Sequence, residues 1–302
     1  QDPSNESYAN LRKQYDRLNS YLSSKGRIDS EAQAEIAGLR NQVQEYSAAN
    51  ANDPRPLPML IQLSTWLQDS VSVDETFGKL SELSNNSRIW TAWANSRIAE
   101  NRYGDAHMLL AEGVDEESRS AEQALIMARC MIAQNRFDDA IDILTAVSDD
   151  APDAEKMKSQ LTSTKAKANR LQASWEDERA LREQEELEGS LPIMQILTSK
   201  GPITVILLEN QAPNTVANFV NLSEKGFFNG QKFHRVVPNF VAQTGDPNSK
   251  PGESGPVGSG GPGYTIPDES SRPDKRLHFS GMLAMAKPGD PTNSGSTLPN
   301  SA

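Results

Sequence analysis

The chain has 302 residues, a formal net charge of −11 and a single cysteine. An acidic chain of this kind is not expected to bind nucleic acid through general phosphate contacts, and one cysteine excludes an intrachain disulfide. No run of about eighteen apolar residues is present, so we expect no transmembrane segment. The net charge is −12 over residues 1–190 and +1 over residues 191–302, and 26 of the 37 glycines and prolines lie in the second part. This division predicts a multidomain α + β chain, with an acidic helical part before a turn-rich β part.

Two helical patterns open the chain. Apolar and aromatic side chains recur at spacings of three and four, at Tyr8, Leu11, Tyr15, Leu18 and Leu22 and again at Ile36, Leu39, Val43 and Tyr46. Ser30 and Gln33 resemble a capping box at the start of the second helix. The pattern predicts an N-terminal helical hairpin over residues 1–52, and the alternative is two helices packed separately on the following domain.

A six-residue motif occurs twice in the next part of the chain. N-R-Y-G-D-A at residues 101–106 returns as N-R-F-D-D-A at residues 135–140, which is 34 residues later. Apolar residues keep the same register around the two copies, at Trp90, Ala94, Leu110, Ala128 and Leu144. This period and pattern are typical of tetratricopeptide repeats, which residues 57–152 resemble, with a degenerate unit at residues 57–84. An unrelated helical bundle is the alternative.

Helical repeats of this kind bind an extended peptide or a helix on their concave face, or they act as spacers. We therefore expect a protein partner on the repeats. Cys130, between two methionines, is expected to be a buried apolar residue rather than a reactive thiol. Residues 153–190 predict a charged linker helix that Gly189 ends, and its sparse apolar residues indicate a solvated helix.

After residue 190 the pattern changes to short strands and turns. It predicts strands at residues 193–197, 203–208 and 279–286, and a helix that begins at Pro213 and ends near Gly226. The stretch F-H-R-V-V-P-N-F-V-A-Q at residues 233–243 predicts a buried strand pair. Arg235 and Gln243 lie in this apolar stretch, and burying either side chain requires a polar partner.

Residues 201–286 resemble the cyclophilin-type peptidyl-prolyl cis-trans isomerases in four ordered motifs. These are A-P-N-T-V-A-N-F-V-N-L, F-H-R-V-V-P-N-F-V-A-Q-T-G-D, G-S-G-G-P-G-Y-T-I-P-D-E and F-S-G-M-L-A-M-A-K. The resemblance implies a cyclophilin-like antiparallel β-barrel over residues 191–302. The family's next motif, G-S-Q-F-F, is not in the sequence, so we expect a truncated barrel with open edges.

The chemistry of the family needs no nucleophile and no cofactor. Rotation about a prolyl amide must overcome a resonance barrier of about 18–20 kcal/mol, and a hydrogen-bond donor to the prolyl nitrogen together with an apolar pocket for the ring lowers it. By motif position, the resemblance implies that Arg235 is this donor and that Phe240 and Val241 line the pocket. It further implies that Gln243 binds the substrate backbone and helps to place the arginine.

Two other positions follow from the resemblance. Ala286 and Lys287 fall where the family contacts the residues before the proline through the main chain. Val241 stands where many members have Met, and Lys287 where Asn is frequent, so the pocket wall differs while the backbone contact is retained. The three histidines of the chain show no ligand or triad spacing, and we expect neither a metal nor a cofactor.

The sequence thus predicts a peptidyl-prolyl cis-trans isomerase that assists protein folding as a chaperone. Its substrates would be proline-containing peptides or unfolded protein clients, and the repeats would hold a client or a partner. The alternative is a non-catalytic adaptor whose cyclophilin-like part only binds proline-containing segments. The polar start at Gln1 fits a mature chain after signal removal or an excised piece. A periplasmic or secreted location and a cytoplasmic one therefore both stay open.

Overall fold

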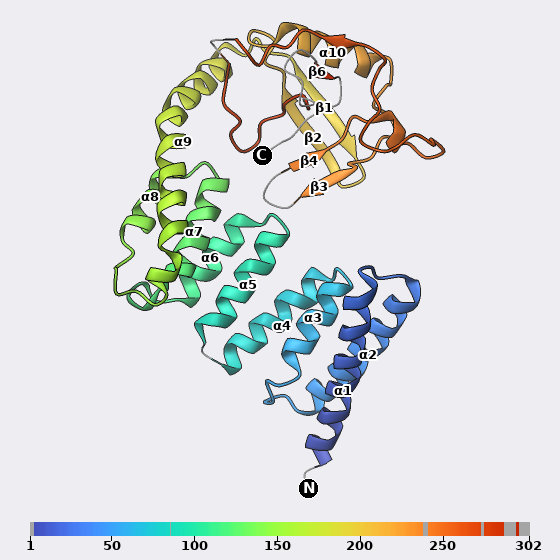
Figure 1. Cartoon of the computed structure of the whole chain (residues 1–302), viewed down its shortest axis with the longest axis vertical. Coiled ribbons are helices and arrows are strands. Elements are labelled where there is room, and N and C mark those ends of the chain that lie inside the picture. The colour runs from blue at the N-terminus through green and yellow to red at the C-terminus, as the bar shows by residue number, and fades with distance from the viewer. Residues whose placement is uncertain (1–2, 85, 238–240, 273–274, 287–293, 296–302) are drawn as a thin grey trace. The chain divides into compact units, whose positions relative to one another are not determined.

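The computed structural model describes the chain (Figure 1) apart from residues 1–2, 85, 238–240, 273–274, 287–293 and 296–302. It divides into two compact units. The first comprises residues 1–96 and 109–116, and the second comprises residues 97–108 and 117–302. Among the described residues, helices fill the chain up to residue 188 and all strands follow it.

The first unit is built on two helix pairs with one shared core. Its helices are α1 (Pro3–Lys25), α2 (Ser30–Ala49), α3 (Leu57–Trp66) and α4 (Ser70–Leu83). The predicted apolar residues of α1 and α2 form this core together with residues of α3, including Leu18, Ile36, Val43, Leu57 and Leu63. The predicted capping box is wrong in detail, because Asp29 is the N-cap of α2 and its carboxylate accepts the Ala32 N–H at 3.0 Å.

Aromatic stacking continues this unit into α5 (Ser87–Ala99). Trp93 stacks on Phe77 of α4 with ring centroids 5.8 Å apart, and its indole N–H donates to the Asp74 carboxylate. Trp90 also fills the space beside Gly113, the last residue of α6 (Tyr103–Gly113). A Cβ added to Gly113 would lie 1.9 Å from the Trp90 ring, so only glycine fits at this position.

The repeated hexapeptide forms the same turn each time it occurs. Asn101 and Asn135 adopt left-handed backbone conformations, with φ of 60° and 59°, as does Gln68 with φ of 57°. In each case the next backbone N–H donates to the carbonyl five residues earlier, in the pairs Asp69–Ser64, Arg102–Arg97 and Arg136–Met131. This arrangement is a Schellman motif, which ends a helix and satisfies its free carbonyls. The turn at Gln68 lies within residues 57–84, where a degenerate unit stays a prediction.

The other residues of the hexapeptide also have structural roles. Arg102 pairs with Asp105 at 2.6 Å, and Arg136 pairs with Asp139 at 2.6 Å. Each aspartate lies in the first turn of the following helix, where the helix dipole favours a negative charge. The closing alanines, Ala106 and Ala140, are fully buried, which lets helices approach closely.

The two asparagines of the motif give a matched stability test. Asn101→Gly relieves the left-handed conformation but loses the exposed hydrogen bond that the Tyr103 hydroxyl donates to Asn101 Oδ1 at 3.1 Å, so we expect the free energy of unfolding to change by less than about 1 kcal/mol. Asn135→Gly keeps this benefit but removes two hydrogen bonds with the backbone of Ser280, at 3.1 and 3.4 Å. We therefore expect Asn135→Gly to be less stable than Asn101→Gly by about 1–2 kcal/mol. Urea denaturation measures both values, and equal effects would contradict this account.

The second unit contains its own helical core. Its helices α7 (Ala121–Ala133), α8 (Phe137–Thr145) and α9 (Ala154–Glu188) follow the short 3-10 helix η1 (Glu116–Ser118). They pack through buried residues that include Leu125, Met131, Leu144, Met157 and Ala168. A capping box of Ser120 and Gln123 begins α7. Cys130 is fully buried, as expected, and this burial raises the pKa of its thiol to about 12.

Small antiparallel sheets and one helix make up the rest of this unit. The elements are β1 (Ile193–Thr198), β2 (Gly201–Ile206), α10 (Pro213–Glu224), β3 (Arg235–Val237), β4 (Val241–Gln243), η2 (Pro247–Ser249), β5 (Thr265–Ile266) and β6 (Ser294–Gly295). Strand β1 pairs with β2, β3 with β4 and β5 with β6. Within the described residues these sheets do not close into a barrel. Leu207 and Phe219 form a small core between the first hairpin and α10.

Buried ion pairs connect α9 to the segment that follows β5. The Arg276 side chain is 5% exposed and donates to Glu178, itself 4% exposed, at 2.7 Å. It also donates to Glu185 at 2.7 Å, and Arg182 donates to Glu178 at 2.5 Å. Most of α9 is therefore solvated as expected, but Glu178 is buried where it pairs with Arg276.

An aromatic cluster lies beside these ion pairs. Phe279 is 3% exposed, and its ring centroid lies 5.0 Å from that of Trp175 in α9 and 5.9 Å from that of Phe137 in α8. The strand predicted at residues 279–286 does not form. A strand needs a free sheet edge, whereas this segment packs its first residues on helices and turns at Gly281 with φ of 85°.

Candidate functional site

The β3–β4 hairpin brings together two of the predicted site residues. Arg235 lies directly opposite Gln243 in the antiparallel register, and the guanidinium Nη1 donates to the Gln243 Oε1 at 3.4 Å. The His234 N–H also donates to the Gln243 carbonyl at 3.0 Å. The expectation of a buried strand pair is wrong for β3, all three of whose residues are exposed. Arg235 is therefore exposed at the surface, where it is hydrogen-bonded to Gln243.

The third site residue of this hairpin is an apolar neighbour of the polar pair. Val241 is 3% exposed and pairs with Val237 across the hairpin. Because side chains alternate along a strand, Val241 lies on the same face as Gln243. Phe240, the other expected pocket residue, lies outside the described residues. The described part of the hairpin thus carries the hydrogen-bond donors of the Arg235 guanidinium together with the apolar side chain of Val241.

The second predicted segment of the site ends near the small core of the β part. Ala286 is half-buried. Its neighbour Met285 packs against the core that Leu207 and Phe219 form. Lys287 lies outside the described residues.

A buried carboxylate organises the loop after the hairpin and was missed in the sequence. Asp246 is fully buried, and its side chain accepts the N–H of Asn248 at 2.8 Å and the N–H of Gly258. The following Ser249 accepts the Lys232 N–H at 3.0 Å, so the loop is tied to the residues before β3. The Asp-Pro-Asn sequence was the available signal, since an aspartate before such a turn bonds its own backbone two residues on.

A second carboxylate, that of Glu269 in the segment after β5, is hydrogen-bonded to the first turn of α10. Glu269 accepts hydrogen bonds from the N–H groups of Asn214 and Thr215, at 3.1 and 2.9 Å, and from the Thr215 hydroxyl at 2.7 Å. It therefore caps the helix from 54 or more residues away along the chain. Burial opposes ionisation of Glu269, but the hydrogen bonds from Thr215 and Asn214 outweigh it and lower the pKa of this carboxyl.

Glu269→Gln is expected to lower the free energy of unfolding by about 1–2 kcal/mol, as the loss of a charged helix cap does. Because the folded-state pKa of Glu269 is lowered, its contribution is present above the ordinary glutamate pKa and is lost as the pH falls through the folded value. The difference between wild type and variant should therefore be larger at pH 7 than at pH 3. Urea melts at the two pH values measure this, and a pH-independent difference would contradict the charged cap.

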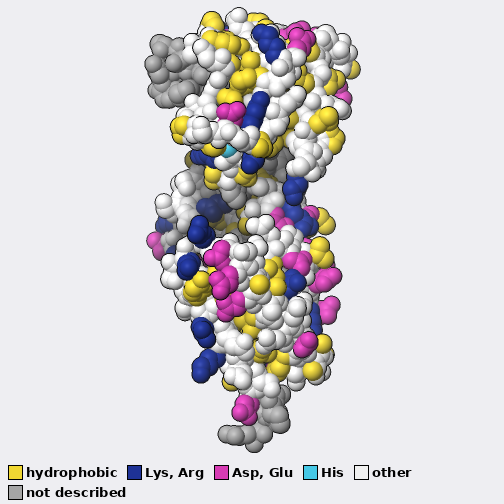
Figure 2. Space-filling view, turned by 90° about the vertical axis from the view of Figure 1, so that its right-hand side faces the viewer, with side chains coloured by type: hydrophobic (Ala, Val, Ile, Leu, Met, Phe, Trp, Pro, Cys, Tyr) yellow, Lys and Arg dark blue, Asp and Glu magenta, His cyan; other side chains and the backbone are white. Residues whose placement is uncertain are grey.

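No cluster of His, Cys, Asp or Glu that could hold a metal occurs among the described residues. No helix in the described ranges is long and apolar enough to cross a membrane. Basic and acidic side chains are interspersed on the face drawn in Figure 2, without a continuous basic stripe.

Comparison with known families shows what two parts of the chain are similar to. Residues 193–297 match the family described as cyclophilin type peptidyl-prolyl cis-trans isomerase/CLD. Residues 97–162 match the tetratricopeptide repeat. Both resemblances inferred from the sequence are therefore confirmed: the chain joins tetratricopeptide-type helices to a cyclophilin-type region.

Individual relatives match the second of these regions. The chain is 47% identical over 92 residues to a peptidyl-prolyl cis-trans isomerase of Synechococcus elongatus, covering 30% of this chain and 57% of that protein. It is 41% identical over 97 residues to peptidyl-prolyl cis-trans isomerase B of Bacillus subtilis, covering 32% of this chain and 62% of that protein. It therefore spans less than two thirds of the length of these relatives. No solved structure gives a significant match.

Proposed function

We propose that the whole protein is a peptidyl-prolyl cis-trans isomerase, with residues 191–302 contributing the front part of a cyclophilin-type antiparallel β-barrel. The family match and the relatives named as isomerases support this proposal. Residues 1–52 would form an N-terminal helical hairpin, residues 57–152 the repeats and residues 153–190 the linker helix. The observation that carries the proposal is the cross-strand pair of Arg235 and Gln243 beside the buried Val241.

The proposed mechanism uses hydrogen bonding alone. Twisting the prolyl amide removes its resonance and makes the nitrogen pyramidal and basic. Arg235 would then donate to this nitrogen more strongly in the twisted state than in either planar state, which is the condition for lowering a barrier. Gln243 would hold the guanidinium in place and bind the substrate backbone. Arginine suits this role because it stays charged and offers several donors in a fixed fork.

The substrate contacts follow from the same proposal. Phe240 and Val241 would line the pocket for the proline ring, and the main chain at Ala286 and Lys287 would contact the residues before the proline. The substrates would be proline-containing peptides or unfolded protein clients. The tetratricopeptide-type helices would hold a client or a partner near the site, in keeping with the general role of such repeats in protein binding.

Magnetisation-exchange NMR on an X–Pro peptide tests the proposal, because it measures the cis–trans exchange rate directly. Addition of the whole protein is expected to accelerate exchange at catalytic concentration. Saturable peptide binding without faster exchange would instead favour an adaptor that binds proline-containing segments but does not catalyse their isomerisation. The open, two-stranded sheets of the described residues favour this second candidate for the chain alone.

A further inference from the structure

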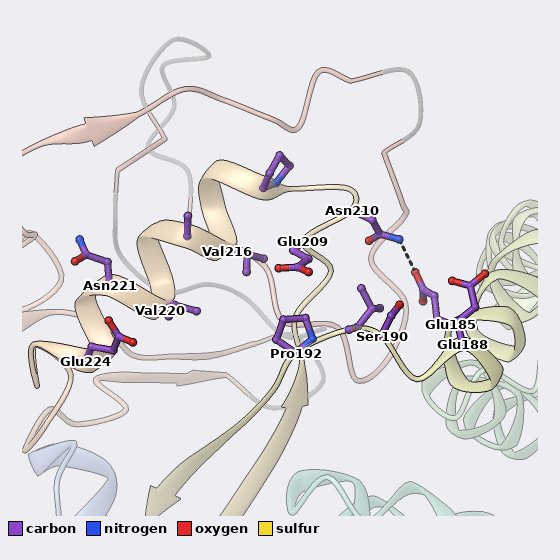
Figure 3. A pocket seen from close by; sticks show the side chains of 13 residues that line it. Glu185, Glu188, Ser190, Pro192, Glu209, Asn210, Val216, Val220, Asn221 and Glu224 are labelled. Carbon is purple, nitrogen blue, oxygen red and sulfur yellow. Dashed lines mark hydrogen bonds between the residues drawn. The ribbon is translucent and has the colours of Figure 1, made fainter.

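A groove separate from the β3–β4 hairpin lies between α10 and the chain that enters β1 (Figure 3). Its volume is about 880 Å³, which is in the size range of binding sites for small ligands and short peptides. One wall is a single face of α10, formed by residues 216, 217, 220, 221 and 224. The other walls are residues 190–192, residues 209–210 and the end of α9.

The floor of the groove is apolar although α10 already has a buried face. Phe219 belongs to the small core of the β part, and Leu222 of the same helix is also buried. Val216 and Val220 flank that core and also line the groove, where Pro192 faces them. A helix with one buried face normally presents polar residues on the other. Val216 and Val220 are only partly buried, so they pack on the core with one side and present apolar surface to the groove with the other.

The rim of the groove is acidic. Glu185, Glu188, Glu209 and Glu224 line it, and none of the described lining residues is a lysine or an arginine. The charge of Glu185 is compensated by Arg276. Within the described part of the chain, Glu188, Glu209 and Glu224 are in no ion pair, and they lie on different walls (Figure 3). The groove therefore places uncompensated negative charge around an apolar floor.

We propose that this groove binds a basic, apolar segment of a partner protein. Apolar side chains of the segment would pack on Val216, Val220 and Pro192, while its lysines or arginines would approach Glu209 and Glu224. Charge complementarity selects this occupant, since an acidic segment would be repelled by the rim and a purely basic one would leave the floor exposed. Proline in the segment is not required, because the groove is separate from the Arg235 hairpin.

A fluorescein-labelled decapeptide of four leucines, four lysines and two alanines, titrated with the full chain, tests the proposal. We expect saturable binding that weakens with added salt. The double variant Glu209→Lys/Glu224→Lys should weaken binding by about tenfold or more. The control Glu155→Lys/Glu183→Lys makes the same change in net charge at exposed positions of α9 outside the groove, and should change the affinity by less than about twofold.

Three outcomes would overturn the proposal: equal weakening by both double variants, equal binding of a peptide with glutamate in place of lysine, or no saturable binding. A second copy of this chain as the occupant is tested by sedimentation of the free protein. A dimer that the Glu209→Lys/Glu224→Lys variant dissociates would show that the groove serves self-association instead. The Arg235→Ala variant should bind the decapeptide normally, which keeps this test independent of isomerase activity.

A variant of the floor supplies a further test that leaves the charges in place. Ala217 lines the groove from α10, and Ala217→Gln would place a larger neutral side chain in it. Glutamine has a helix propensity close to that of alanine, so the fold should be retained. We expect the affinity for the leucine–lysine peptide to fall at least about fivefold. Unchanged affinity in a folded Ala217→Gln protein would contradict binding on this floor.

Discussion

Arg235→Ala in the full-length protein is expected to reduce catalysed cis–trans exchange of an X–Pro peptide by about 10²- to 10³-fold. This is the usual cost of removing one donor that is directed at the charge developing in a transition state. The fall should be in kcat more than in KM, because the hydrogen bond to the prolyl nitrogen strengthens only as the amide twists. Magnetisation-exchange NMR over a range of peptide concentrations separates the two parameters.

Arg235→Lys is the matched control for this variant. It keeps the positive charge but loses the planar fork that reaches both Gln243 and the substrate, so we expect an intermediate rate. Arg235 is exposed, and neither variant should change the melting temperature appreciably. Full activity in a folded Arg235→Ala protein would remove Arg235 from the mechanism.

Arg276→Ala is expected to have the largest effect on stability. The variant leaves Glu178, which is 4% exposed, without its main cation in a buried site. Removing one partner of a buried pair typically costs about 3–5 kcal/mol, because the remaining charge is uncompensated. We therefore expect the second unit to unfold at clearly lower urea concentration. The fluorescence of Trp175 should report this unfolding, since its ring packs against Phe279.

Arg179→Ala is the control for Arg276→Ala, since both remove an arginine paired with a glutamate of α9. The Arg179–Glu183 pair is 65% and 69% exposed and 3.9 Å apart, so its loss should cost less than about 1 kcal/mol. Equal destabilisation by the two variants would show that the Arg276 cluster is not specially important. Arg276→Lys should recover only part of the stability, because an ammonium cannot bridge Glu178 and Glu185 as the guanidinium does.

The repeats were the part of the fold that the sequence predicted best. The motif N-R-x-x-D-A is visible because each of its fixed positions has a local structural role. The asparagine adopts the left-handed turn, the arginine and aspartate form an ion pair, and the alanine is buried. The turn at Gln68 is followed by none of the other residues of the motif, so the pattern indicates the predicted unit at residues 57–84 only weakly. The β1–β2 hairpin and α10 were similarly predictable from turn and capping residues near in sequence.

The parts that could not be predicted depend on contacts distant in sequence. Nothing in the polar pattern of α9 indicates that Glu178 pairs with Arg276, which is 98 residues away. The apolar run at residues 279–286 has the pattern of a strand, but Phe279 packs on helices instead. For the site, the sequence resemblance selected Arg235 and Gln243, and the cross-strand geometry could be expected only after the hairpin register was known.

The contacts of Asn135, Phe137 and Trp175 have a consequence for the architecture of the repeats. A stack of helical repeats has two ends, and each end must be shielded from water by a special capping element. Here α9 and the segment at residues 276–280 cover the last repeated pair, α7 and α8, in place of such an element. Phe279 and Ser280 of the cyclophilin-type region thus take part, together with α9, in covering the end of the repeats.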